Sequence, residues 1–209
     1  MIYLKRFDSH SEYSEYTTSE NMVKPNVSRC DEEKHVHYNP IPHDYSKDYL
    51  TIESLENGTT IYFKGNSTSN TKTISASTDN GVTWSEYTSS TGGSGTTIAT
   101  LFRGKKILIK GENAQYGSYP SSKFMVSGQF EVKGNIMSLI SGDSFENANT
   151  LISGSTFASM FSNNPSLVSA ENLILPSTTT SYCYQNMLSN CKNLTTAPKL
   201  PATNLSCET

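Results

Sequence analysis

Hydrophobic and polar residues alternate in short runs throughout residues 47 to 142. Alternation of this kind sends successive side chains to opposite faces of a β-strand. Turn-forming residues separate the runs, for example at Asn57-Gly58, at Asn80-Gly81 and in the glycine-rich stretch 90–96. Seven or eight strands at such spacing predict an antiparallel β-sandwich, either immunoglobulin-like or a jelly roll, and the pattern fits both. The runs cover residues 49–55, 59–65, 71–77, 82–88, 96–102, 105–111, 123–134 and 135–141.

An internal repeat occupies residues 143 to 209. Two segments match at a spacing of 27 residues, and Leu175-Pro176 matches Leu200-Pro201 after a two-residue shift. Such repeats predict stacked turns of a solenoid whose apolar positions face the neighbouring turn. Two turns bury little by themselves and a third would start near Cys207, so we expect the natural protein to continue or this form to be truncated. The matching pairs are Phe157 and Tyr184, Met160 and Met187, Asn163 and Asn190, Leu167 and Leu194, and Ala170 and Ala197.

Residues 1 to 46 form a third part with shorter patterns. Residues 2–7, 23–30 and 34–40 alternate like strands, and Ser9 and Glu12 have the spacing of a helix capping box. A segment this small cannot bury a core by itself. Its apolar residues therefore either dock on the sandwich of the same chain or bind a partner protein. We predict partner binding, for which strand addition to a sheet edge is a suitable mode. The residues concerned are Tyr3, Leu4, Phe7, Val23, Pro25, Val27, Val36 and Tyr38.

Length, charge and cysteine content exclude several classes of protein. The 209 residues suffice for one or two small domains. A net charge of -3 with scattered lysines argues against nucleic acid as a partner. No apolar run approaches the ~20 residues of a membrane span, and the N-terminus lacks the apolar stretch of a secretory signal, so we expect synthesis in a cytoplasm. The four cysteines are too sparse for a disulfide framework and are expected to be reduced.

Residues 77–84, "STDNGVTW", resemble the Asp-box hairpin of sialidase propeller blades. A sialidase needs several blades and three arginines that converge on the substrate carboxylate. The chain has one such box, and its only arginines are Arg6, Arg29 and Arg103. We therefore interpret the box as a turn, in which Asp79 accepts backbone N–H groups and Trp84 packs on the hairpin. The alternative is that Trp84, the only tryptophan, stacks on a sugar.

Other candidate chemistry is sparse. Cys30, His35, His37 and His43 lie within a short stretch and include types of side chain that bind zinc, but their spacing fits no closed zinc motif. No nucleophile elbow, phosphate loop or His-Glu-x-x-His motif occurs. We therefore predict no enzymatic activity, no metal and no cofactor. Acidic residues that could pair in space are expected to be solvated surface charges; they are Asp79, Glu112, Asp143 and Glu146.

The second repeat unit, "YCYQNMLSNCKNLTTAPKLPAT" at residues 182–203, resembles the BspA-like leucine-rich repeats. The resemblance covers about a quarter of the chain. The first unit departs from the family pattern at Asn164 and Pro165, where a cysteine and a small polar residue are usual. The resemblance implies a surface-displayed solenoid that serves adhesion.

The N-terminal segments "KPNVSRC" and "VHYNP" resemble a leader shared by virion proteins of crAss-like phages of gut Bacteroidales. This implies a head fibre or capsid decoration protein on the virion surface, assembled in the host bacterial cytoplasm. Residues 1–46 would bind the major capsid protein or another virion protein, 47–142 would form the sandwich, and 143–209 the start of the solenoid. A homodimer or homotrimer and a host-surface glycan or protein at the distal end are further expected partners. The alternatives are a tail-attached receptor-binding protein, a bacterial surface adhesin and a carbohydrate-binding module.

Overall fold

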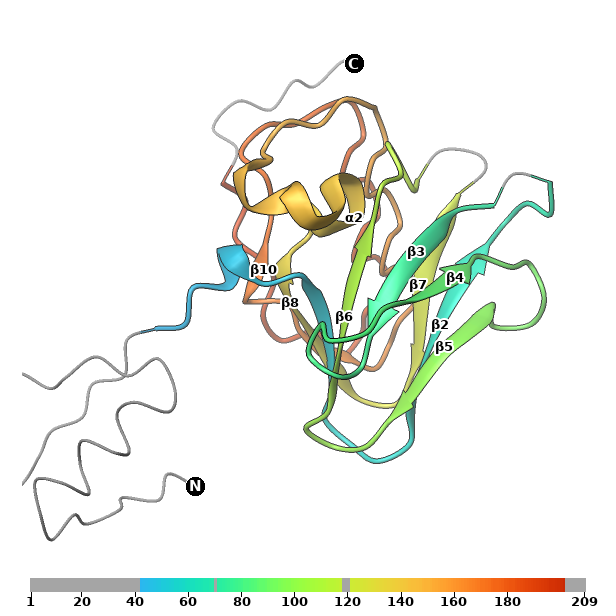
Figure 1. Cartoon of the computed structure of the whole chain (residues 1–209). Helices are drawn as coiled ribbons and strands as arrows, with labels where there is room; N and C mark the ends of the chain where they lie inside the picture. The colour runs from blue at the N-terminus through green and yellow to red at the C-terminus, as the bar shows by residue number, and fades with distance from the viewer. Residues whose placement is uncertain (1–41, 70, 118–120, 202–209) are drawn as a thin grey trace, which may run out of the picture. The chain divides into compact units, whose positions relative to one another are not determined.

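The fold is taken from a computed structural model, which describes residues 42–69, 71–117 and 121–201 (Figure 1). The predictions for residues 1–41 and 202–209 lie outside the described residues. The chain is mainly β, and one compact unit begins at Asp44. Its helices are η1 (Tyr45–Lys47), α2 (Ser138–Ser141) and η2 (Gly142–Asn147). Its strands are β1 (Leu50–Ser54), β2 (Thr59–Gly65), β3 (Thr73–Ser77), β4 (Ser85–Thr88), β5 (Thr96–Leu101), β6 (Lys106–Gly111), β7 (Ser122–Ser127), β8 (Phe130–Asn135), β9 (Leu167–Ser169) and β10 (Leu173–Ile174).

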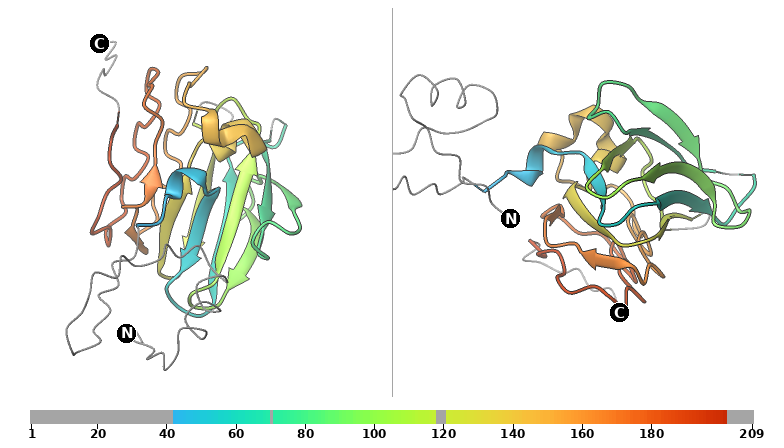
Figure 2. Two further views of the ribbon diagram at one scale, coloured as in Figure 1. Left: turned by 60° about the vertical axis from the view of Figure 1, so that its left-hand side comes forward. Right: turned by 90° about the horizontal axis from the view of Figure 1, so that it is seen from below.

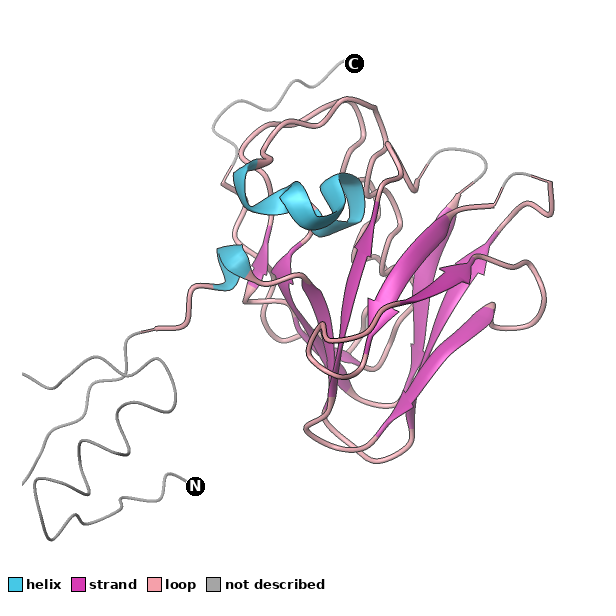
Figure 3. Cartoon of the chain, viewed as in Figure 1, coloured by secondary structure: helices cyan, strands magenta, loops and turns pink. Residues whose placement is uncertain are grey.

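Two sheets are formed by the described residues (Figure 3). A seven-stranded sheet has the order β10-β8-β1-β6-β3-β4, with β9 also paired to β8, and a three-stranded sheet has the order β5-β2-β7. Strands β1 to β8 pair in antiparallel fashion, whereas β9 and β10 run parallel to β8. We call the part built from β1 to β8 the two-sheet region, and its arrangement is consistent with the predicted β-sandwich.

The alternating runs become strands with one buried face. In β2 every second residue is buried, and Ile61 and Phe63 are fully enclosed. In β6 the same alternation buries Ile107 and Ile109. Burial of such side chains contributes about 1.5–3 kcal/mol each. The buried apolar cluster continues without interruption into the C-terminal residues, as far as Met187.

Two sequence predictions need correction. Residues 135–141, predicted as a strand, contain helix α2, because Ile136, Leu139 and Ile140 have helical spacing and turn toward the core or its margin. The run 123–134 forms two strands, β7 and β8, that belong to different sheets. The chain reverses between them at Gly128, whose φ of 91° is accessible to glycine without strain. In the part of the chain that the structure describes, no helix has the length and apolar character needed to cross a bilayer.

The C-terminal residues form two segments that lie side by side (Figure 2), here called the first repeat segment (residues 151–177) and the second repeat segment (residues 178–201). The backbone N–H groups of Phe157 and Phe161 donate to the carbonyls of Cys183 and Met187 at 2.8 and 3.0 Å. The side chain of Asn190 donates to that of Asn163, 27 residues earlier. The two segments share one backbone conformation, because positive φ recurs at equivalent positions: Ser155, Ser159 and Asn163 in the first, and Tyr182, Asn186 and Asn190 in the second.

The first repeat segment is joined to the two-sheet region by hydrogen bonds. Strands β9 and β10 extend the seven-stranded sheet at β8. The N–H group of Phe124 in β7 donates to the carbonyl of Met160 at 2.9 Å. The buried Asn164 side chain donates to Phe124 and accepts from the N–H group of Val126 at 2.9 and 2.8 Å. Hydrogen bonds therefore connect the two sheets to the first repeat segment, and the first repeat segment to the second.

Candidate functional site

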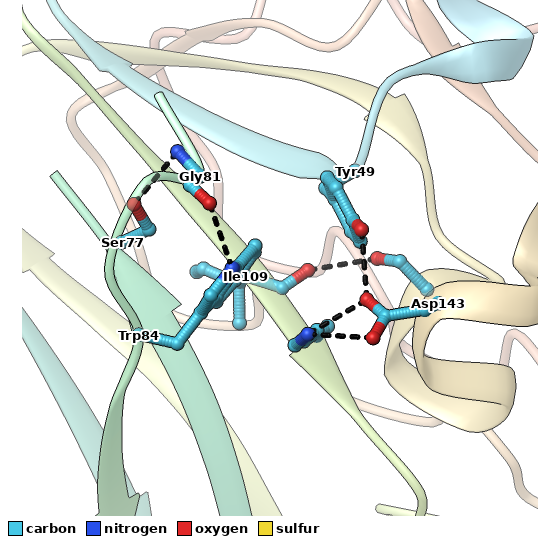
Figure 4. Close-up of polar contacts among 8 residues, drawn as sticks. Tyr49, Ser77, Gly81, Trp84, Ile109 and Asp143 are labelled. Atoms are coloured by element: carbon cyan, nitrogen blue, oxygen red, sulfur yellow. Dashed lines mark hydrogen bonds and ion pairs between the residues drawn. The ribbon is translucent and has the colours of Figure 1, made fainter. Parts of the chain in front are cut away.

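The Asp-box turn is closed by its own residues, and Figure 4 shows two of these contacts, from Gly81 to Ser77 and from Trp84 to Gly81. The hydroxyl of Ser77 donates to Asp79 at 2.6 Å and accepts from the N–H group of Gly81 at 2.9 Å. The carboxylate of Asp79 accepts the N–H and hydroxyl groups of Thr83 at 2.9 and 2.6 Å. Hydrogen bonds from Ser77 and Thr83 lower the pKa of Asp79 to about 2. The carboxylate therefore serves the turn, as the sequence predicted.

Trp84 is held on the outer side of the seven-stranded sheet. Its indole N–H donates to the carbonyl of Gly81 at 3.1 Å. The ammonium of Lys110 in β6 lies 4.2 Å from the centre of the Trp84 ring, and the ring of Tyr49 meets it edge-on at 5.0 Å. Lys110 is in turn paired with Asp143 in η2 at 2.7 and 2.9 Å. We call Tyr49, Trp84, Lys110 and Asp143 the aromatic patch.

The surroundings of Tyr49 and Asp143 hold each of these two groups in one charge state. Hydrogen bonds from Lys110 and Tyr49 lower the pKa of Asp143, so this carboxylate stays ionised at neutral pH. Burial, and then the hydrogen bond to Asp143, raise the pKa of Tyr49 to about 12, so the phenol stays neutral. General acid or base catalysis at neutral pH requires a group that titrates near that pH. Neither Asp143 nor Tyr49 does so.

The aromatic patch favours the packing role of Trp84 over the sugar-stacking alternative. A sugar stacks on an open aromatic face. Lys110 lies over the Trp84 ring, and a cation in this position contributes about 0.5–1 kcal/mol at an exposed site. The patch ties four segments of the chain together, because β1 follows Tyr49, Trp84 precedes β4, Lys110 belongs to β6 and Asp143 to η2.

Metal ligands and the predicted partner-binding residues fall largely outside the described residues. Of the four candidate zinc ligands only His43 is described, and no three His, Cys, Asp or Glu side chains in residues 42–69, 71–117 and 121–201 are grouped to hold a metal ion. Cys183 and Cys191 are free thiols. The eight predicted partner-binding residues all lie outside the described part: Tyr3, Leu4, Phe7, Val23, Pro25, Val27, Val36 and Tyr38.

The second repeat segment has one covered side and one open side. Its Tyr184 ring stacks on Phe157 of the first repeat segment, with 6.2 Å between ring centres and 9° between planes. Cys183 and Met187 are buried against the first segment. Tyr182 and Leu200, in contrast, have 60% and 65% of their surface exposed. This open side is the second candidate site.

The sequence patterns predicted neither the aromatic patch nor the open side of the second repeat segment, although they pointed to some of the residues in each. Tyr49 and Lys110 carry no local signal that would join them to Trp84, because the sheet order brings them together across distant strands. The repeat alignment did contain two pairs that make contact: Phe157 and Tyr184, whose rings stack, and Asn163 and Asn190, whose side chains are hydrogen-bonded. Equivalent positions of adjacent repeats predict direct contacts of this kind.

The comparisons with known proteins add no relative to this picture. No family model, no curated protein and no solved structure matches the chain. Evidence for the function of this chain therefore comes from the geometry of the described residues and from the resemblances in its sequence.

Proposed function

We propose that the protein is a non-enzymatic structural protein of a phage virion surface, a head fibre or capsid decoration protein. The observation that carries the proposal is the continuous hydrogen-bonded path from the two-sheet region into the repeat segments. A rigid connection of this kind suits a protein that holds a distal surface away from its point of attachment. Within the aromatic patch, neither Tyr49 nor Asp143 titrates near neutral pH, which supports a non-enzymatic role.

The proposed architecture has three parts. Residues 1–46 attach the protein, residues 47–142 form an immunoglobulin-like or jelly-roll β-sandwich, and residues 143–209 belong to a BspA-like solenoid. The solenoid part is supported by the recurrence of positive φ at Asn163 and Asn190 and by the side-chain hydrogen bond between them. Adhesion to a host-surface glycan or protein is assigned to this end.

Attachment is assigned to the apolar residues of the N-terminal segment. Their proposed partner is the major capsid protein or another virion protein. The support is the resemblance of "KPNVSRC" and "VHYNP" to phage virion leaders and the surplus of apolar side chains in a segment too short to bury them. Strand addition to a sheet edge of the partner is the proposed mode.

The test compares two deletions made in the phage genome. Deletion of residues 1–46 should abolish incorporation of the protein into purified particles, measured by quantitative mass spectrometry. Deletion of residues 202–209, which lie outside the described residues, is the matched control and should leave incorporation intact. Equal incorporation of the first deletion and the full chain would overturn the attachment role. Detection of the full chain in the bacterial envelope and its absence from particles would favour the adhesin alternative.

A further inference from the structure

The open side of the second repeat segment presents a regular row of backbone donors. The N–H groups of alternate residues have no hydrogen-bond partner among the described residues. The intervening N–H groups are satisfied within the segment; for example, Gln185 donates to Tyr182 and Met187 donates to Tyr184. We call the unpaired set the open edge; it consists of the N–H groups of Tyr182, Tyr184, Asn186, Leu188 and Asn190.

The equivalent donors of the first repeat segment show what this row binds. There, five alternate N–H groups each donate to a carbonyl of the second segment at 2.8–3.0 Å. The donors are Ser155, Phe157, Ser159, Phe161 and Asn163, and the acceptors lie 26 residues further along the chain at Ser181, Cys183, Gln185, Met187 and Ser189. The stack of turns therefore has a direction. The alternate N–H groups of a turn face the following turn, and its alternate carbonyl groups face the preceding one.

Aromatic side chains of the two repeat segments also lie at equivalent positions. Tyr184 occupies the position of Phe157 and stacks on it through one face of its ring. The hydroxyl of Tyr184 is buried and has no hydrogen-bond partner within the described residues. A buried hydroxyl without a partner destabilises the folded chain.

The polarity of the open edge argues against a symmetric dimer through this surface. A two-fold axis would place one donor row against an identical donor row, and two sets of N–H groups cannot pair with each other. The occupant must present carbonyl groups at alternate residues, in the conformation that positive φ produces at Tyr182, Asn186 and Asn190. A further turn of the same repeat meets both conditions, and its interface would continue the one already formed between the two segments.

We infer that the open edge is a docking surface for one further 27-residue turn of the same repeat, stacked on the second repeat segment. The inference depends on the repeat geometry and is independent of the virion assignment. Five backbone hydrogen bonds and the ring of Tyr184 define the register, so that the added turn follows at the spacing seen between Asn163 and Asn190. The predicted homo-oligomer would then have to use another surface.

The test extends the full chain and measures amide hydrogen exchange by NMR. A second copy of residues 183–204 is appended directly after Thr209, which keeps the 27-residue spacing. The control carries the same appended residues in shuffled order. In the unextended chain the five amides of the open edge should exchange without protection, while those of Phe157 and Phe161 are protected. In the extended chain the five should slow by about 100-fold or more, as amides do when they become bonded in a stable element.

Two results would overturn the inference. The first is equal exchange of the five amides in the extended chain and in the shuffled control. The second is protection of the same amides in the unextended chain that rises with protein concentration, because it would identify a second copy as the occupant. Neither result would change the expected outcome of the particle experiment, because that experiment depends on residues 1–46.

Discussion

Asn164 is the residue at which the first repeat segment is fastened to the two-sheet region. The residue is 1% exposed. It accepts from the N–H group of Val126 at 2.8 Å and donates to the carbonyls of Phe124 and Phe161, both at 2.9 Å. The Asn164→Ala substitution removes all three hydrogen bonds and leaves the groups on β7 buried without partners.

The size of the effect follows from these contacts. The Phe161 carbonyl keeps a contact with the thiol of Cys191 at 3.2 Å, so two groups, on Phe124 and Val126, lose their only side-chain partner. A buried polar group left unsatisfied costs about 1–3 kcal/mol. We therefore expect Asn164→Ala to lower the free energy of unfolding by about 3 kcal/mol. At a slope of about 2 kcal/mol/M, the urea midpoint should fall by about 1.5 M.

Urea unfolding followed by the fluorescence of Trp84, the only tryptophan, measures this change. Asn193→Ala is the matched control, because Asn193 is exposed and its side chain makes no hydrogen bond to the described residues; its effect should stay within about 0.5 kcal/mol. Asn164→Asp should be at least as damaging as the alanine variant, since a carboxylate cannot donate to the two carbonyls. A midpoint for Asn164→Ala equal to that of the control would refute the reasoning.

Three further predictions concern other contacts. Gly117→Ala should destabilise the protein by about 2–3 kcal/mol, because its Cβ would lie 2.4 Å from that of Ala158, whereas Gly92→Ala, in open space, should be neutral in thermal unfolding. The pKa of Asp79 is lowered to about 2, so its stabilisation is present above its ordinary value near 3.8 and is lost as the pH falls toward 2; a stability difference between wild type and Asp79→Asn that stayed constant over this range would count against it. The pKa of Tyr49 is raised to about 12, so stability should fall as the pH rises from about 10 to about 12, and Tyr49→Phe should remove that part of the alkaline loss; equal losses in both proteins would contradict the assignment.

Local patterns in the sequence predicted the strands well where alternation was strict. The run 59–65 is strand β2 to the residue, and 105–111 contains β6. The pattern did not indicate which sheet each strand joins, because sheet order is set by packing between distant residues. It also missed helix α2, whose single turn lies in an apolar run too short to distinguish helix from strand.

The repeat alignment was the more informative signal for the candidate site. It predicted the partners Asn163 and Asn190 directly. It also marked Asn164 as a departure from the repeat pattern, and the structure supplies the reason: Asn164 faces β7 and satisfies its backbone, whereas the equivalent Cys191 faces the first repeat segment. The aromatic patch had no comparable signal in the sequence. Tyr49, Trp84 and Lys110 are far apart along the chain and come together only through the order of strands in the sheet.

The central claim is that the two-sheet region and the repeat segments form one cooperative unit. It is tested most directly by comparing two probes in a single urea titration: Trp84 fluorescence for the sheets, and alkylation of the buried Cys183 thiol, followed by mass spectrometry, for the repeat. Two-state unfolding predicts coincident midpoints for the two probes. Reaction of Cys183 at a urea concentration where Trp84 fluorescence is still native would show that the repeat unfolds separately, and would contradict the claim.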